Sequence, residues 1–279
     1  AGVATAWAGT TAIALIPASL VMRELVNSAM ATRSSTAVER SSLRAAATEY
    51  WRFTGPRAVG QVSEVTVTWL DTVLVGSLIG AAAAGIYGAG TRYVLPGIFV
   101  ADAIMQVVGP RISGMMSRGE HGEARKMLVI TTGWQVSVLW PIYILVLFFA
   151  PSMLRVFGEE VVAATGALRW LACGVLVSSL AGPAASVILM SGRSVQAMLN
   201  TAALVAINVA GNFALVPIFG IAAAGAVWGL TLVVSSFLPA VQAHRSLGLS
   251  TFGHPARLAA LFASIAFIPT AAGSLFLLG

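Results

Sequence analysis

The sequence predicts an all-α, polytopic transmembrane helical bundle that crosses the bilayer about seven to eight times. Of its 279 residues, 58% are hydrophobic and 9% are charged, whereas a soluble domain carries roughly a quarter charged residues. The mean hydropathy is +0.88, and the apolar residues form long runs instead of the alternating pattern of barrel strands. Because lipid cannot satisfy free backbone groups, such runs cross a membrane as helices.

Eight apolar runs approach or exceed the length needed to cross a hydrocarbon core about 30 Å thick. In chain order they cover residues 3–22, 58–81, 84–109, 127–150, 160–191, 195–218, 222–243 and 256–278. The run 160–191 is longer than one straight span, so we expect it to be tilted or to start as an interfacial turn. Since the sequence starts and ends inside apolar runs, we expect it to be a fragment of a longer protein.

Positive charge alternates between successive connections. Six arginines lie within residues 23–57 and four basic residues within 110–126, whereas Arg155 is accompanied by Glu159 and Glu160 in its connection. Basic connections stay on the cytoplasmic side of a membrane. Every second connection is therefore predicted to be cytoplasmic, and we expect a multi-pass protein of the bacterial plasma membrane.

Several classes of function are excluded by composition and motifs. The net charge is +6, but the cations are spread among apolar runs, which argues against a nucleic-acid partner. Cys173 is the single cysteine, and the three histidines lie far apart in polar connections. The spacing Gly80–Gly85 resembles a phosphate-binding loop but lacks the lysine that must follow. The sequence thus predicts no enzyme, no cofactor and no metal site.

Ionisable residues inside the predicted spans are the candidate site residues, because each costs several kcal/mol at the bilayer centre unless it faces a cavity or a partner. They are Glu64, Asp71, Arg92, Asp102 and Arg169. A rise of about 1.5 Å per residue places Asp71, Arg92 and Arg169 at nearly the same depth. Asp102 falls near the cytoplasmic rim.

Glu64 and Asp71 are seven residues apart and share a helix face, which we expect to look into an aqueous cleft. Two interpretations remain open. In the first, Asp71 and Arg92 pair and neutralise one another. In the second, Arg92, with Arg169, contacts an anionic phosphate group while Asp71 or Glu64 holds a proton or cation. For Arg169, an interfacial position is the stronger alternative.

Small and polar residues suggest contacts between helices. Asn208 and Asn212 are one turn apart, which predicts a hydrogen bond between helices more than a ligand contact. The segments Gly80–Gly85 and Gly220–Gly225 resemble one another, and each precedes an aromatic residue and a glycine. An internal repeat and chance both explain this resemblance. We expect the glycines of Gly80–Gly85 to allow close helix packing.

Short motifs between about residues 50 and 245 resemble a known family. They are Asp71–Gly76, Gly85–Tyr87, Gly109–Ser113, Phe157–Gly158 and the series Asn208, Asn212, Pro217, Gly220, Gly225. In these motifs the chain resembles the second half of polysaccharide flippases of the O-antigen and teichoic-acid type. These flippases belong to the multidrug, oligosaccharidyl-lipid and polysaccharide exporter superfamily.

The resemblance implies two six-helix lobes around a central cavity, open alternately to either side. The substrate would be an undecaprenyl-diphosphate-linked oligosaccharide, flipped to the outer face among membrane lipids, with a proton or sodium ion as coupling partner. Asp71 and Arg92 would line the cavity. Residues 1–22 would be the last helix of the first lobe and 23–50 a cytoplasmic linker. Residues 51–243 would be the second lobe, and 244–279 a cytoplasmic loop and the start of an extra helix pair.

Other functions remain open at this stage. A multidrug exporter or a flippase for the peptidoglycan precursor would share the same lobes. A cation exporter should carry acids in its cavity without a competing arginine, so Arg92 argues against it. A membrane anchor or assembly protein without transport would use Asp71 and Arg92 only as a structural pair.

Overall fold

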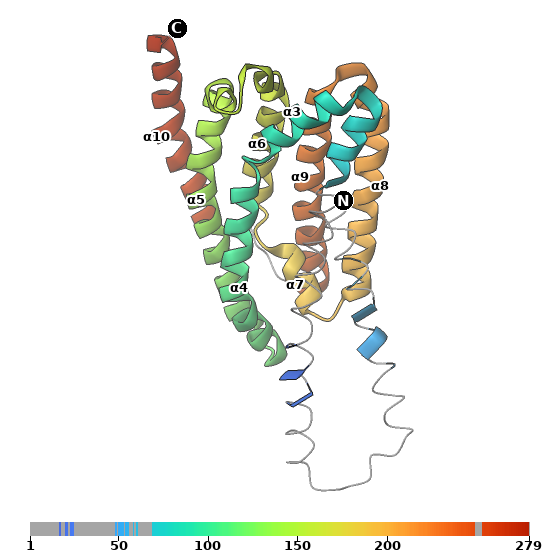
Figure 1. Ribbon diagram of the computed structural model, residues 1–279. Helices are drawn as coiled ribbons and strands as arrows, with labels where there is room; N and C mark the ends of the chain where they lie inside the picture. The colour runs from blue at the N-terminus through green and yellow to red at the C-terminus, as the bar shows by residue number, and fades with distance from the viewer. Residues whose placement is uncertain are drawn as a thin grey trace, which may run out of the picture. The chain divides into compact units, whose positions relative to one another are not determined.

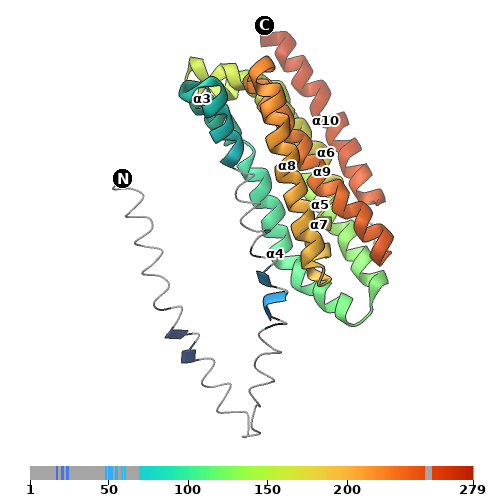
Figure 2. The ribbon, with the colours of Figure 1, turned by 90° about the vertical axis from the view of Figure 1, so that its right-hand side faces the viewer.

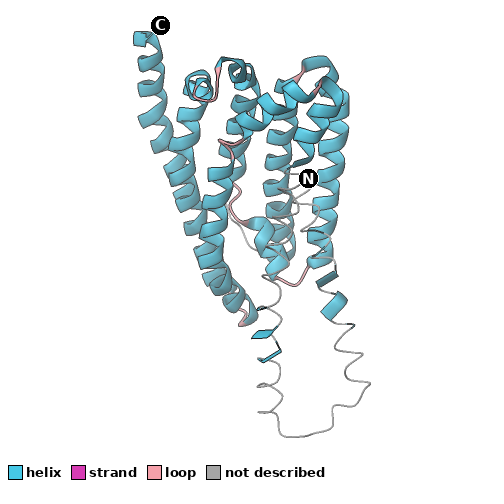
Figure 3. Ribbon diagram, in the orientation of Figure 1, coloured by secondary structure: helices cyan, strands magenta, loops and turns pink. Residues whose placement is uncertain are grey.

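A computed structural model describes residues 69–248 and 253–278, together with single positions before residue 69. The chain divides into two compact units, Ala1–Trp51 and Arg52–Gly279, and all the elements below belong to the second. Within the described residues every regular element is a helix, so the predicted all-α class is confirmed (Figure 3). Glu64 and most of the predicted span 3–22 lie outside the described residues. The division into lobe, linker and extra helices stays a prediction.

The described helices follow one another with short turns. The elements are the helix Trp69–Ile79, α3 (Ala81–Thr91), α4 (Leu95–Ser117), α5 (His121–Arg155), the 3₁₀ helix η1 (Glu159–Ala164), α6 (Thr165–Ser179), α7 (Ala184–Met190), α8 (Ser194–Phe219), α9 (Ile221–Leu247) and α10 (His254–Leu278). In the described part of the chain, five helical stretches are long and apolar enough to cross a membrane: α4, α5, η1 with α6, α8 and α9. The chain is a multi-pass membrane protein.

The helices of this unit lie lengthwise beside one another (Figure 1, Figure 2). Helix α5 packs against α4, α6 and α10, and α9 packs against α6 and α8. A shared apolar core includes Tyr87, Tyr143, Leu168 and Trp228. The α5–α6 and α8–α9 connections lie at one end of the bundle and the α4–α5 and α7–α8 connections at the other (Figure 1). Two of the connections predicted to be cytoplasmic, α4–α5 and α7–α8, thus share one end.

The prediction of one span over residues 84–109 is wrong. Helix α3 ends at Thr91 and α4 begins at Leu95. Between them, Tyr93 and Val94 donate their backbone N–H groups to Gly90 and Thr91, three residues back. Pro96 stands in the first turn of α4, where its missing N–H is harmless, but it disfavours helical geometry in the residue before it. The chain therefore passes through a tight turn inside the apolar run 84–109.

The run 160–191 also divides. It starts with the 3₁₀ helix Glu159–Ala164, as the interfacial-turn alternative predicted, and continues as α6. Helix α6 ends at Ser179, and Gly182 adopts a φ of +62° before Pro183 and α7. A positive φ suits glycine alone among common residues. This break explains why the apolar run is longer than a straight span requires.

Small residues bring α6 and α9 into close contact. A Cβ at Gly225 would overlap the backbone of Ala167, and one at Gly229 would lie 2.7 Å from the carbonyl oxygen of Trp170. Gly174 faces Gly229 in the same way, with 2.6 Å between a built Cβ and the Gly229 Cα. Two helices in lipid gain most of their attraction from such close packing.

The two similar segments share a turn but differ in packing. Gly80 and Gly220 both have positive φ values, +103° and +65°, and each lies between two helices. Tyr87 and Trp228, the aromatic residues that follow, are both buried. However, no atom lies within 4 Å of a Cβ built at Gly85, so the prediction of close packing at Gly80–Gly85 is wrong. In that segment Gly80 allows the turn between the two helices.

Candidate functional site

Asp71 lies in a buried polar cluster. Its side chain has no exposed surface, and its Oδ1 accepts a hydrogen bond of 2.8 Å from Nδ2 of Asn212 on α8. Its Oδ2 accepts a longer one, 3.4 Å, from the Tyr87 hydroxyl on α3. Three helices thus meet at one carboxylate. Asn212 lies seven residues from the end of α8, which is roughly 10 Å along the helix.

Asn208 completes this cluster and leaves two polar atoms without partners. The Asn212 Nδ2 also donates to the backbone oxygen of Asn208, at 2.9 Å, and to its Oδ1, at 3.2 Å. Among the described residues, Nδ2 of Asn208 and Oδ1 of Asn212 are buried without a hydrogen-bond partner. The predicted bond between helices is confirmed. Buried orphans of this kind call for an explanation, such as a water or an ion.

Arg92 does not pair with Asp71. Within the described residues the ion pairs are those of Arg118, Lys126 and Arg155 with nearby glutamates, so the first of the two open interpretations, a pair of Asp71 and Arg92, is wrong. The Arg92 side chain is exposed and lines a cavity of about 350 Å³, named here the Arg92 cavity. Its wall contains Trp69, Thr72, Gly85, Gly88, Thr91 and Trp228, from the helix Trp69–Ile79, α3 and α9.

Tyr143 on α5 holds the turn that carries Arg92. Its hydroxyl is buried and lies 3.2 Å from the oxygen of Tyr93 and 2.9 Å from that of Val94. The Val94 oxygen also accepts from the backbone N–H groups of Gly97 and Ile98. The same hydroxyl accepts a bond of 3.1 Å from the backbone N–H of Gly97. Gly97 allows this approach, because a Cβ there would overlap the Tyr143 ring. The phenol therefore contacts the backbone of the turn and of the first turn of α4.

Arg169 serves a different carbonyl. Pro151 lies inside α5 and lacks the N–H that would bond the residue four positions earlier. That residue is Leu147, and its oxygen accepts a bond of 3.1 Å from Nε of Arg169. The Arg169 side chain is exposed and is not part of the Arg92 cavity lining. The geometry favours the structural alternative for this arginine.

A second cavity, about 400 Å³, lies among α4, α5, α7, α8 and α9. We name it the Asp102 cavity, because Asp102 is the ionisable residue among its described lining residues. Hydroxyl and amide side chains make up the rest of its polar lining. They are Gln135, Ser186, Ser194, Asn200, Thr201, Thr231, Ser235 and Ser236. Trp228 lines both cavities.

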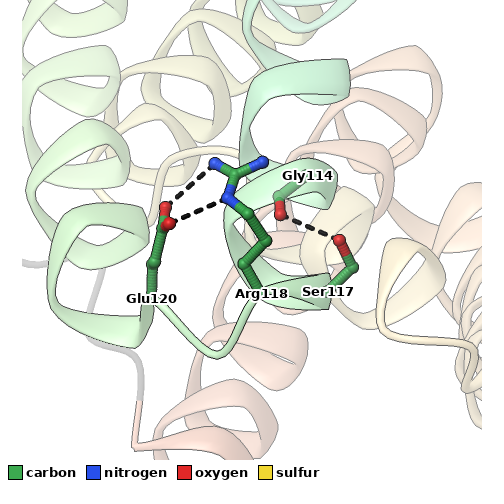
Figure 4. A network of polar contacts seen from close by, with 4 residues as sticks. All are labelled: Gly114, Ser117, Arg118 and Glu120. Carbon is green, nitrogen blue, oxygen red and sulfur yellow. Dashed lines mark hydrogen bonds and ion pairs between the residues drawn. The ribbon is translucent and has the colours of Figure 1, made fainter.

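The α4–α5 connection carries an exposed ion pair (Figure 4). Arg118 donates from Nε and Nη2 to the two carboxylate oxygens of Glu120, at 2.8 and 2.9 Å. These hydrogen bonds, with the charge of the guanidinium, lower the pKa of Glu120 below its ordinary value. Ser117 bonds the Gly114 oxygen on the neighbouring turn at 2.8 Å. The network lies at the basic end of the bundle.

Sequence reasoning missed three participants in these sites. Tyr87 was noted only in the repeated segment and in the motif Gly85–Tyr87, although its hydroxyl bonds Asp71 on the neighbouring helix. Tyr143 carries no motif, and only the break in the preceding helices reveals its role. Trp228 was noted as part of a repeat, not as a cavity wall. No group of three or more potential metal ligands gathers within the described residues.

Comparison with known proteins points to one family. The family model described as "Polysaccharide biosynthesis protein" matches residues 1–164. The multidrug resistance protein NorM of Burkholderia vietnamiensis is 32% identical over 150 residues, 51% of this chain and 32% of that protein.

Two solved structures share the fold at 18% identity. One is an outward-facing multidrug resistance MATE family transporter of the MOP superfamily, with a TM-score of 0.53. The other is a MOP superfamily transporter from Pyrococcus furiosus, described by the reverse polarity of its binding pocket, with a TM-score of 0.50. Each comparison covers 80% of this chain and 52% of the other. The chain thus spans about half the length of these structures, and about a third of the NorM protein.

Proposed function

Because the chain belongs to the polysaccharide biosynthesis protein family, we propose that it forms part of a transporter for a lipid-linked oligosaccharide. The transporter carries an undecaprenyl-diphosphate-linked sugar chain from the cytoplasmic to the outer face of the plasma membrane by alternating access. Membrane lipids surround the bundle, and no cofactor takes part. The helical, multi-pass fold supports this proposal, since a transporter needs spans that enclose polar cavities.

The free Arg92 is the observation that carries the proposal. Among the described residues no acidic side chain pairs with it, yet it lines a cavity within a bundle of membrane spans. A cation inside a membrane costs several kcal/mol unless water or an anion compensates it. Arginine stays charged and donates two parallel hydrogen bonds to a phosphate. The diphosphate group of the proposed substrate is the anion that would contact Arg92.

Asp71 is the coupling acid in this proposal. Uncharged partners surround it, and the unpartnered Asn212 Oδ1 and Asn208 Nδ2 lie beside it. A carboxylate without a cationic partner gains most from a proton or a small cation such as sodium. Binding and release of that cation would change which hydrogen bonds the three helices share. This change links the cation gradient to the movement of the lobe. Glu64, on the predicted same helix face, is proposed as a second acid.

The test is translocation in proteoliposomes. We expect the reconstituted protein to move a fluorescent undecaprenyl-diphosphate sugar, and Arg92→Ala to reduce the rate by about tenfold or more through the lost charge-assisted hydrogen bonds. Asp71→Asn should remove the dependence on a proton or sodium gradient. Arg169→Gln is the control, because its arginine bonds a backbone oxygen. Wild-type rates in Arg92→Ala would contradict the proposed anion site.

Similarity to the NorM protein favours multidrug export as a second candidate. Asp102 and Asp71 would then attract a cationic drug, and Arg92 would oppose it. The same vesicles loaded with ethidium separate the two. Gradient-driven ethidium movement, with no movement of the undecaprenyl-diphosphate sugar or of a labelled peptidoglycan precursor, would establish the exporter. Movement of none of the three would indicate an anchor or assembly protein.

A further inference from the structure

We infer that the Asp102 cavity binds the uncharged, hydroxyl-bearing part of the ligand whose anionic part contacts Arg92, and that Asp102 excludes acidic sugars. This inference rests on the proposed function and deepens it, because it names the substrate class. Lipid diphosphates that carry neutral sugars should be accepted, and those that carry uronic or other acidic sugars next to the diphosphate should be rejected.

The two cavities have opposite charge and share a wall. Arg92 is the ionisable residue among the described residues of one lining, and Asp102 that of the other. Trp228, only 4% exposed, lines both. Leu95, at the start of α4, lines the Arg92 cavity, and seven residues separate it from Asp102, which is roughly 10 Å of helix, so one elongated ligand can span both cavities. An indole face at the junction also suits the apolar face of a sugar ring.

The Asp102 cavity offers hydrogen-bond acceptors more than donors. Thr231 and Ser235 donate their hydroxyl hydrogens to Val227 and Leu232 of their own helix, so only their lone pairs remain. Thr201 donates to Ala197 in the same way. Asp102 is an acceptor when ionised. A phosphate or carboxylate placed here is repelled by the charge of Asp102, whereas sugar hydroxyls can donate to that carboxylate.

Other polar groups of this cavity remain available. Gln135, Ser186 and Ser236 line it, and the described residues provide none of them with a side-chain hydrogen-bond partner. Asn200 is already engaged with Gln242, through bonds of 2.7 and 2.8 Å. The volume of about 400 Å³ falls within the range of about 300–1,000 Å³ for small-molecule sites. The cavity thus has room and free groups for a sugar.

A cationic drug would also meet acceptors in this cavity. The Arg92 cavity across Trp228 opposes a cation, however, and the remaining lining consists of neutral hydroxyl and amide groups. Neutral donors satisfy such groups without the cost of burying an unpaired charge. The observations therefore favour a hydroxylated ligand over a cation, and the experiment below includes a cation as one arm.

Binding to the protein in lipid nanodiscs tests the inference. Three lipids are compared: undecaprenyl diphosphate alone, with a neutral N-acetylhexosamine disaccharide, and with the same disaccharide bearing a carboxylate. We expect the neutral glycolipid to bind about tenfold more tightly than either of the others, as hydrogen bonds to a charged group imply. In Asp102→Asn, the affinities for the neutral and the acidic glycolipid should lie within about twofold of one another. The double variant Ser186→Ala, Ser236→Ala should reduce the difference in affinity between the neutral glycolipid and undecaprenyl diphosphate alone.

Controls separate this inference from the proposed function. Ser137→Ala removes a hydroxyl that bonds its own helix on α5, and it should change nothing. Arg92→Ala should weaken the binding of all three lipids alike, so that the ratios of their affinities stay the same. Thermal unfolding shows whether each variant is folded. Free disaccharide should displace the neutral glycolipid only weakly, since it lacks the diphosphate.

Several results would overturn the inference. An unchanged preference in a folded Asp102→Asn variant would do so while leaving the proposed function intact, as would equal binding of the three lipids by wild type. Displacement of the neutral glycolipid by ethidium, or equally well by the free disaccharide, would reassign the cavity to a cation or a soluble sugar. Wild-type protein that binds none of the three lipids would remove the inference and the proposed function together.

Discussion

Nδ2 of Asn212 on α8 donates a hydrogen bond of 2.8 Å to Oδ1 of Asp71, which lies 141 residues earlier in the chain. Both side chains are fully buried. A carboxylate in such a place depends on each donor that faces it, because no water replaces a lost one. The bond therefore joins the helix Trp69–Ile79 to α8.

Loss of this bond should destabilise the bundle. Asn212→Leu removes a hydrogen bond to a charged or polar acid, which is worth about 1.5–3 kcal/mol. In Asp71→Asn the penalty of Asn212→Leu should be smaller, since a neutral amide needs the donor less. A double-mutant cycle by thermal unfolding in detergent measures this coupling. Independent, additive effects would show that the two side chains do not interact.

Tyr143→Phe tests the broken helix. The variant keeps the ring but removes the hydroxyl that lies against the Tyr93 oxygen. The Val94 oxygen and the Gly97 N–H keep their bond to one another. Unsatisfied backbone groups in lipid cost about 1–3 kcal/mol. We expect a lower unfolding temperature and weaker binding of undecaprenyl diphosphate, because the turn that holds Arg92 loosens. A stability loss with unchanged binding would show that the turn does not position Arg92.

A matched control is Tyr93→Phe. The partly buried Tyr93 hydroxyl donates a hydrogen bond of 2.7 Å to the backbone oxygen of Met153, so this variant also loses one phenol hydroxyl. It releases no carbonyl of the turn itself. Its effect on ligand binding should therefore be smaller than that of Tyr143→Phe, even where the two lose similar stability.

Arg169 and Pro151 should show compensating effects. Arg169→Leu leaves the Leu147 oxygen without a donor and should cost about 1 kcal/mol. Pro151→Ala restores an N–H four residues after Leu147, which can take over as donor. Arg169→Leu should thus cost less in the Pro151→Ala background. Equal costs in both backgrounds, measured by thermal unfolding, would contradict the role assigned to Arg169.

Gly85→Ala and Gly225→Ala should change the stability of the protein in opposite directions: Gly85→Ala should raise it and Gly225→Ala should lower it. A Cβ at Gly225 would overlap the Ala167 backbone, whereas the space around Gly85 is open. Overpacking costs typically about 1–3 kcal/mol, and replacing a helical glycine by alanine gains about 0.5–1 kcal/mol. Unfolding temperatures of the two variants decide the matter. Similar changes in both would show that the α6–α9 contact is not tight.

The Arg118–Glu120 pair predicts a pH dependence. The lowered pKa of Glu120 means that its ionised form stabilises the folded state at neutral pH, and that this contribution disappears as the pH falls through that pKa. Glu120→Gln should therefore lower the unfolding temperature slightly at pH 7 and not at strongly acidic pH. Both side chains are exposed, so high salt should also remove the difference. A difference that persists in acid would point to another cause.

The sequence predicted the helices better than their breaks. Apolar length alone identifies α5, α8 and α9, because lipid permits little except a helix there. The turn before Pro96 interrupts an apolar run with only Thr91 and Arg92 as strongly polar residues next to it, and hydropathy does not register it. The break at Gly182 and Pro183 had one sign in the sequence: the apolar run 160–191 is longer than one straight span requires.

The sequence predicted a common level for Asp71 and Arg92 along their helices, but it did not predict which way their side chains point. Counting residues placed Asp71 and Arg92 at one level, and Thr72, the neighbour of Asp71, does line the Arg92 cavity. The direction of a side chain around its helix depends on which helices pack on it, and no local pattern supplies that. Asp71 bonds Asn212 and Tyr87, so the ion pair with Arg92 that the sequence left open does not form.

The long separation between Asp71 and Asn212 has a consequence for how the protein is made. Ribosomes add roughly 5–20 residues per second, so Asn212 is synthesised roughly 7–30 s after Asp71. During that interval the acid enters the insertion machinery without its donor. Newly made helices around Asp71 should then wait at the translocon, or the acid should be protonated, until α8 arrives. Truncation before α8 should make these early helices targets for membrane proteases.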